Sequence, residues 1–143
     1  MKLRISLIAV LFLFLSSSNI NPQDSGLTTD STKLAVVWSS GDPDVAEKVC
    51  LMYTHAAKRA KWFDEVVLIV WGPSAKLLTE NEKLQGKIKA MIKDGVKLQA
   101  CIACARMYGD EVVNKLKDLG IEVKGMGVPL SNYLKDGWKT LTF

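Results

Sequence analysis

Two cysteines separated by two residues, Cys101 and Cys104, are the side chains best suited to nucleophilic chemistry. The apolar run from Val96 to Ala100 predicts a buried strand, and the residues from Cys101 to Tyr108 are typical of a helical turn. Cys101 would then begin a helix, where free N–H groups and the helix dipole favour a thiolate. Cys104, one turn further on, is close enough to resolve a persulfide or to close a disulfide. The spacing therefore predicts a thiol or sulfur function.

Two other roles for these cysteines follow from residue type alone. A buried cysteine can serve only as a small apolar side chain. A closed zinc site needs four ligands, and a single C-x-x-C motif has no second pair in this sequence, so we expect no metal. On the first predicted helix, Cys50 is expected to be packed and His55 to face solvent. The expected order of reaction with a limiting alkylating reagent is Cys101, then Cys104, then Cys50.

Short apolar or β-branched runs alternate with helical patterns along the chain. Strands alternating with helices at this spacing form right-handed βαβ units. The pattern predicts an α/β protein, a three-layer α/β/α domain with a mainly parallel five-stranded sheet. The predicted strands are Leu34 to Trp38, Val66 to Trp71, Val96 to Ala100, Ile121 to Val123 and Thr140 to Phe143.

The helices have recognisable start and stop signals. Asp42 is a predicted N-cap, with Pro43 in the first turn. Gly-Pro at 72–73 is expected to stop regular structure, and a T-x-x-E capping box at 79–82 predicts the start of the next helix. A brief last helix is expected at 131–135. The buried stripe of the first helix is predicted to be Val45, Val49, Met52, Ala56 and Ala60.

Ligands of open α/β sheets bind beyond the carboxyl ends of the strands, so the loops at that edge contain the remaining candidates. The loop with Ser39 precedes a helix start that offers N–H groups to an anion. Trp71 and Met126, together with Trp38, would line an apolar pocket. Arg106, just beyond the cysteine pair, would bind an oxyanion or a persulfide. The predicted substrate-binding residues are therefore Ser39, Trp71, Arg106 and Met126.

The first part of the 143-residue chain has the organisation of a secretory signal peptide. Lys2 and Arg4 precede an apolar run at 5–15, and serines follow it, which predicts a signal peptide at 1–18 and a periplasmic or secreted protein. A polar leader at 19–32 and a domain at 33–143 would follow. Loss of Lys2 and Arg4 lowers the net charge from +4 to +2, and the lysines are mixed with acids, so we expect neither nucleic-acid binding nor membrane attachment after cleavage.

Residues 33–143 resemble the DsrE/DsrF-like sulfur-relay family. The resemblance depends on the strand Lys33 to Trp38, the stretch K-L-Q-A-C-I-A-C-A-R-M-Y-G at 97–109 and the glycine-bearing loop at 125–129. It implies that Cys101 is the acceptor cysteine that carries a persulfide. It also implies a homotrimer or homohexamer that passes sulfur between donor and acceptor proteins or small thiols, without a dissociable cofactor.

Two features separate this chain from the family pattern and keep other functions open. Predicted export argues against sulfur delivery to transfer RNA, and Cys104 is a second thiol that a simple carrier does not require. One alternative is a C-x-x-C thiol-disulfide oxidoreductase, although two strand–helix units precede the motif here. The other is a non-catalytic oligomeric module that binds a small ligand.

Overall fold

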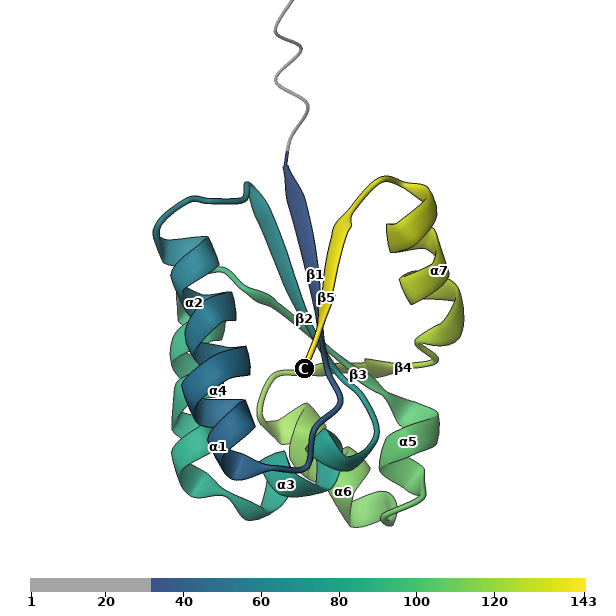
Figure 1. The fold of residues 1–143 in the computed structure, drawn as a ribbon. Coiled ribbons are helices and arrows are strands. Elements are labelled where there is room, and N and C mark those ends of the chain that lie inside the picture. The colour runs from purple at the N-terminus through teal and green to yellow at the C-terminus, as the bar shows by residue number, and fades with distance from the viewer. Residues whose placement is uncertain (1–31) are drawn as a thin grey trace, which may run out of the picture.

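The computed structural model describes residues 32–143, which form a five-stranded sheet flanked by helices (Figure 1). The strand order is β4-β3-β2-β1-β5, and all four neighbouring pairs are parallel. This confirms the predicted α/β class, with a sheet that is entirely parallel. The predicted signal peptide and nearly all of the predicted leader lie outside the described residues. The strands are β1 (Lys33–Trp38), β2 (Glu65–Val70), β3 (Lys97–Cys101), β4 (Glu122–Lys124) and β5 (Lys139–Thr142).

The strand order explains how the helices divide between the two faces. From β1 to β4 each connection moves one strand in the same direction, so right-handed crossovers place their helices on one face. The connection from β4 runs back to β5, and α7 therefore covers the opposite face (Figure 1). The helical segments are α1 (Pro43–Val45), a π-helical turn η1 (Ala46–Cys50), α2 (Leu51–Arg59), α3 (Pro73–Glu80), α4 (Glu82–Lys93), α5 (Ile102–Arg106), α6 (Asp110–Asp118) and α7 (Gly127–Lys135).

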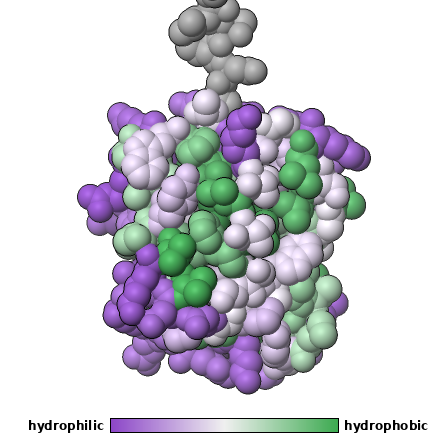
Figure 2. Space-filling view, viewed as in Figure 1, coloured by the Kyte–Doolittle hydropathy of each residue, from purple (hydrophilic) through white to green (hydrophobic). Residues whose placement is uncertain are grey.

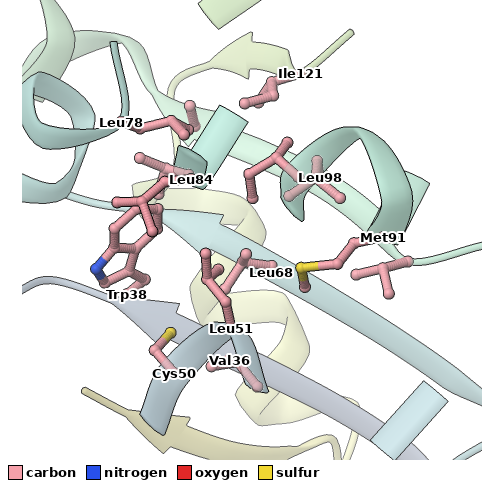
Figure 3. Packing of buried hydrophobic residues seen from close by; sticks show 14 of the residues in the cluster. Val36, Trp38, Cys50, Leu51, Leu68, Leu78, Leu84, Met91, Leu98 and Ile121 are labelled. Atoms are coloured by element: carbon pink, nitrogen blue, oxygen red, sulfur yellow. The ribbon is translucent and has the colours of Figure 1, made fainter. Parts of the chain in front are cut away.

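The two faces of the sheet bury two separate apolar clusters, because alternate strand residues point to opposite sides. The larger cluster, under the helices that follow β1, β2 and β3, includes Val36, Trp38 and Leu68 (Figure 3). The smaller cluster, on the α7 face, contains Val37, Ile69 and other residues. Cys101 belongs to the smaller cluster, so its sulfur lies on the face that α7 covers.

The start of the first helix is confirmed, but its predicted buried stripe is wrong. Asp42 Oδ1 accepts hydrogen bonds from the N–H groups of Asp44 and Val45, as an N-cap should. Val49 and Met52, however, are 42% and 62% exposed. The face that meets the sheet includes a polar residue, Thr54, whose hydroxyl is satisfied by the helix itself. The residues of η1 and α2 that are buried are Ala46, Cys50, Leu51, Thr54 and Ala57.

Three helix boundaries also differ from prediction. Pro73 does not stop regular structure; it occupies the first turn of α3, where its missing N–H is no loss. The expected capping box at 79–82 does not form, because Thr79 is still inside α3 and Asn81 caps α4 by accepting the Leu84 N–H. The last helix, α7, is longer than the predicted segment 131–135. Among residues 32–143, no helix combines the length and the apolar character needed to cross a bilayer.

Candidate functional site

Cys101 is the last residue of β3 and the N-cap of α5, which confirms its predicted place at a strand-to-helix turn. Alternation along β3 sends Leu98 and Ala100 to the larger cluster, and Gln99 and Cys101 to the α7 face. Its side chain is only 5% exposed and shares a cluster with Met126. Neighbouring side chains therefore cover the sulfur, which does not lie open at the sheet edge.

Cys104, in the first turns of α5, is half-buried and lies next to Cys101; both thiols are free. Burial raises the pKa of the Cys104 thiol, and a hydrogen bond with the Cys101 sulfur raises this pKa further. A hydrogen bond with the backbone of Gly72 lowers the pKa of the Cys104 thiol. Burial and the contact with Cys101 both favour the protonated form of Cys104, whose S–H lies beside the Cys101 sulfur.

Gly72, which follows β2, has a backbone conformation that glycine supplies readily. Its φ of 66° and ψ of −132° lie in a region that L side chains rarely adopt, and its backbone faces the Cys104 thiol. Ser74 fixes the loop beside Gly72. Its buried hydroxyl donates a 2.6 Å hydrogen bond to the Trp38 carbonyl and accepts a 3.0 Å hydrogen bond from the Trp71 N–H. The end of β2 is thereby held against the end of β1.

A chain of polar side chains lies on the same face, two residues before Cys101. The Tyr133 hydroxyl donates a 3.0 Å hydrogen bond to Gln99 Oε1, and Gln99 Nε2 donates a 2.9 Å hydrogen bond to Glu122 Oε2. Lys124 Nζ donates a 2.8 Å hydrogen bond to Glu122 Oε1. The hydrogen bond from Lys124, followed by that from Gln99, lowers the pKa of the Glu122 carboxyl. The network connects α7, β3 and β4 around the cysteine face, and we refer to these four residues as the Gln99 network.

Lys124 was not identified from the sequence. It is the register partner of Cys101 on the neighbouring strand β4. The alternation of Gln99 and Cys101 on one face follows from their spacing. The pairing of β3 with β4 in this register depends on a contact between segments more than twenty residues apart, and no local pattern reveals it.

The four predicted substrate-binding residues have different surroundings. Met126 is 1% exposed and Trp71 is half-buried, and both pack in the cluster of Cys101. Arg106 is exposed, and the Ser39 hydroxyl donates 2.9 Å to the Phe143 carbonyl. The prediction that Trp38 lines the pocket is wrong, because Trp38 is fully buried in the larger cluster on the other face (Figure 3).

The remaining thiol and the single histidine lie away from the cysteine pair. Cys50 is fully buried in the larger cluster (Figure 3), and burial raises the pKa of its thiol to about 12. His55 Nε2 is 2.7 Å from Asp94 Oδ2, at a hollow of about 750 Å³ between α2 and α4 that neither Cys101 nor Cys104 lines. Within residues 32–143 no three His, Cys, Asp or Glu side chains converge into a group able to hold a metal ion.

The chain matches a family model and solved structures. The model of a family described as DsrE/DsrF-like matches residues 32–143. A solved structure of a conserved protein of unknown function from Bacteroides thetaiotaomicron, BT1422, superposes with a TM-score of 0.73 at 33% sequence identity. This similarity covers 78% of the present chain and 94% of the other. None of the curated proteins compared with the chain matches it.

Proposed function

Because the chain belongs to the DsrE/DsrF-like family, we propose that it is a thiol-based sulfur carrier or sulfurtransferase that acts through Cys101. The observation that supports this most is the pairing of Cys101 with Cys104. The proton is favoured on Cys104, and Cys101 lies between a buried strand and a helix start. Burial of Cys101 would also protect a bound sulfur atom from stray thiols in solution.

The proposed step moves one sulfur atom without net oxidation. The Cys101 thiolate attacks the outer sulfur of a donor persulfide, R–S–SH. The S–S bond of the donor breaks, and its inner sulfur leaves with the electron pair and takes the proton. The products are Cys101–S–S⁻ and R–SH, so atoms and charge balance and no electron acceptor is needed. The same exchange with an acceptor thiol returns the sulfur.

The test is the intact mass of protein isolated without reductant, before and after incubation with inorganic polysulfide. We expect an adduct of about 32 Da, one added sulfur, on Cys101. Cys101→Ser should abolish this adduct, whereas Cys104→Ser should retain it and prolong its lifetime, since the resolving thiol is gone. Retention of sulfur by Cys101→Ser would show that Cys101 is not the carrier.

A second candidate function is thiol-disulfide exchange, which is favoured by the direct contact of the two sulfurs. Such a protein would be isolated about 2 Da lighter, with Cys101 and Cys104 joined, and either serine variant would lose the reaction. The carrier instead keeps its sulfur adduct when Cys104 is replaced. A binding module would function with both cysteines replaced.

We also propose that the protein self-associates, as a trimer or hexamer by analogy with the family. The support is a set of exposed apolar side chains on η1, α2, the loop after α2 and β5: Val49, Met52, Trp62 and Leu141 are all at least 38% exposed. Figure 2 shows apolar residues gathered across the centre of the face on which β5 lies. Surfaces of this kind commonly bind other proteins. Light scattering at micromolar concentration tests this, and a monomer would refute it.

Export completes the proposal and sets its partners. A periplasmic or secreted carrier would receive sulfur from and deliver it to exported proteins or small thiols, with no cofactor of its own. N-terminal sequencing of protein from the host should find a start near Asn19. Protein that still begins at Met1 in a membrane fraction would contradict export without affecting the role of Cys101.

A further inference from the structure

We propose that Lys124 provides the positive charge that stabilises the sulfur anion on Cys101, an inference that rests on the proposed sulfur transfer. The two residues are directly paired between β3 and β4. Neighbouring strands lie about 4.8 Å apart, so a lysine in register reaches the space over its partner. Neither the cysteine motif nor the family match assigns a role to this lysine.

The geometry places both side chains on one face of the sheet. Gln99 and Glu122 form the register pair two residues earlier, and their side chains are hydrogen-bonded at 2.9 Å on the α7 face. Two residues further along each strand, the side chains return to the same side. Lys124 confirms this alternation on β4, since its ammonium contacts Glu122 at 2.8 Å. Cys101 and Lys124 are thus the next pair on this face.

The Gln99 network fixes Lys124 on the α7 face, with its ammonium on Glu122, two residues before the register partner of Cys101. One oxygen of Glu122 accepts the Gln99 amide and the other accepts Lys124, while Tyr133 orients Gln99 from α7. A lysine has three N–H donors, and this contact uses one of them. Two donors of Lys124 therefore remain for a sulfur anion on Cys101, and the Glu122 carboxylate competes with that anion for the ammonium. Arg106, the other nearby cation in sequence, is exposed on α5.

The consequence is electrostatic and can be measured without a natural partner. A positive charge beside the sulfur attracts anionic reagents to Cys101 and stabilises a persulfide anion there. Iodoacetate is an anion and iodoacetamide is neutral, so the ratio of their reaction rates at one cysteine reports the local charge. Fragmentation of the labelled peptide assigns each rate to Cys101 or to Cys104.

The experiment compares Lys124→Met, Lys124→Arg and Glu122→Gln in the intact protein. Lys124→Met should lower both the iodoacetate-to-iodoacetamide ratio at Cys101 and the rate of sulfur uptake from inorganic polysulfide, each about three- to tenfold. Lys124→Arg should restore both, because it keeps the charge. Glu122→Gln should raise both, because it removes an anion and frees Lys124. If the role of Lys124 were purely structural, Lys124→Met and Glu122→Gln would change the ratio and the uptake rate in the same direction.

Matched controls are Lys89→Met and Lys117→Met, which remove a positive charge from exposed positions. Neither should change the ratio or the uptake rate more than twofold, roughly the effect expected from screened surface charge. The inference is overturned if Lys124→Met leaves both values unchanged, or if Arg106→Met, which removes the alternative cation, lowers them while Lys124→Met does not. Failure of the unchanged protein to bind sulfur at Cys101 would instead refute the proposed function, and the alkylation ratio would still report the charge of Lys124.

Discussion

The hydroxyl of Tyr133, on α7, donates a 3.0 Å hydrogen bond to Gln99, two residues before Cys101 on β3. This contact holds the only helix on its face of the described sheet against the strand that ends at the cysteine pair. The ring of Tyr133 also packs on Trp138, with centroids 4.5 Å apart. The position of α7, and with it the cover over Cys101, therefore depends in part on one phenolic hydroxyl.

Tyr133→Phe should keep the ring packing and lose that hydrogen bond. Because the amide oxygen of the buried Gln99 then lacks a partner, we expect a loss of about 1 kcal/mol in the free energy of unfolding. Looser cover should also increase the rate at which iodoacetamide modifies Cys101. Urea unfolding and peptide mapping measure the two effects. An unchanged stability would show that water replaces the hydroxyl without cost.

Gly72→Ala tests the backbone that faces Cys104. No atom lies within 4 Å of the position a Cβ would take, so only the φ of 66° opposes the substitution. Strain of this kind costs about 1–3 kcal/mol. Displacement of the Gly72 backbone should also raise the pKa of the Cys104 thiol further, which ultraviolet titration of the thiolate would detect.

Gly86→Ala is the matched control, since Gly86 lies inside α4 with equally open space and an ordinary helical conformation. Alanine should stabilise the protein there by about 0.5–1 kcal/mol. Equal effects of the two substitutions would contradict the argument from φ.

Ser74→Ala should destabilise the sheet edge at which the site lies. The buried hydroxyl joins the ends of β1 and β2, and its loss leaves the Trp38 carbonyl with one partner fewer. We expect a cost of about 1–2 kcal/mol in thermal or urea unfolding. Ser131→Ala removes an exposed hydroxyl that bonds only within its own helix, and should cost less than about 0.5 kcal/mol.

Cys50 should be the last of the three cysteines to react. With burial raising its pKa from about 9 to about 12, its thiolate at neutral pH is about a thousandfold scarcer than that of an ordinary cysteine. We expect labelling of Cys50 only when the protein unfolds. Rapid labelling of native protein at Cys50 would contradict its burial.

The same thiol predicts a decline of stability at alkaline pH. Above about pH 9 the unfolded state ionises Cys50 while the folded state keeps its proton, so the free energy of unfolding falls, by up to about 1.4 kcal/mol per pH unit. The contribution is fully present below that pH. Cys50→Ala should lack this part of the slope, measured as a difference between the two proteins so that other groups cancel.

Local patterns in the sequence predict most of the fold because strands buried on both faces and helix caps are short-range features. The runs before Trp38 and Ala100 are continuous and apolar, and Asp42 with Pro43 is a sufficient start signal for a helix. The place of Cys101 at a strand-to-helix turn follows from the same reasoning, since the end of β3 is also the start of α5. These inferences require no knowledge of which strands are neighbours.

Tertiary contacts determined the rest. The apolar positions Val49 and Met52 face outward, because Thr54 can be buried by donating its hydroxyl to the Cys50 carbonyl, a choice that hydrophobic periodicity does not encode. Cys101 and Lys124 are register partners only because β4 pairs with β3 in this register. Register and helix facing are set by burial of the whole sheet, which is a property of distant segments meeting in space.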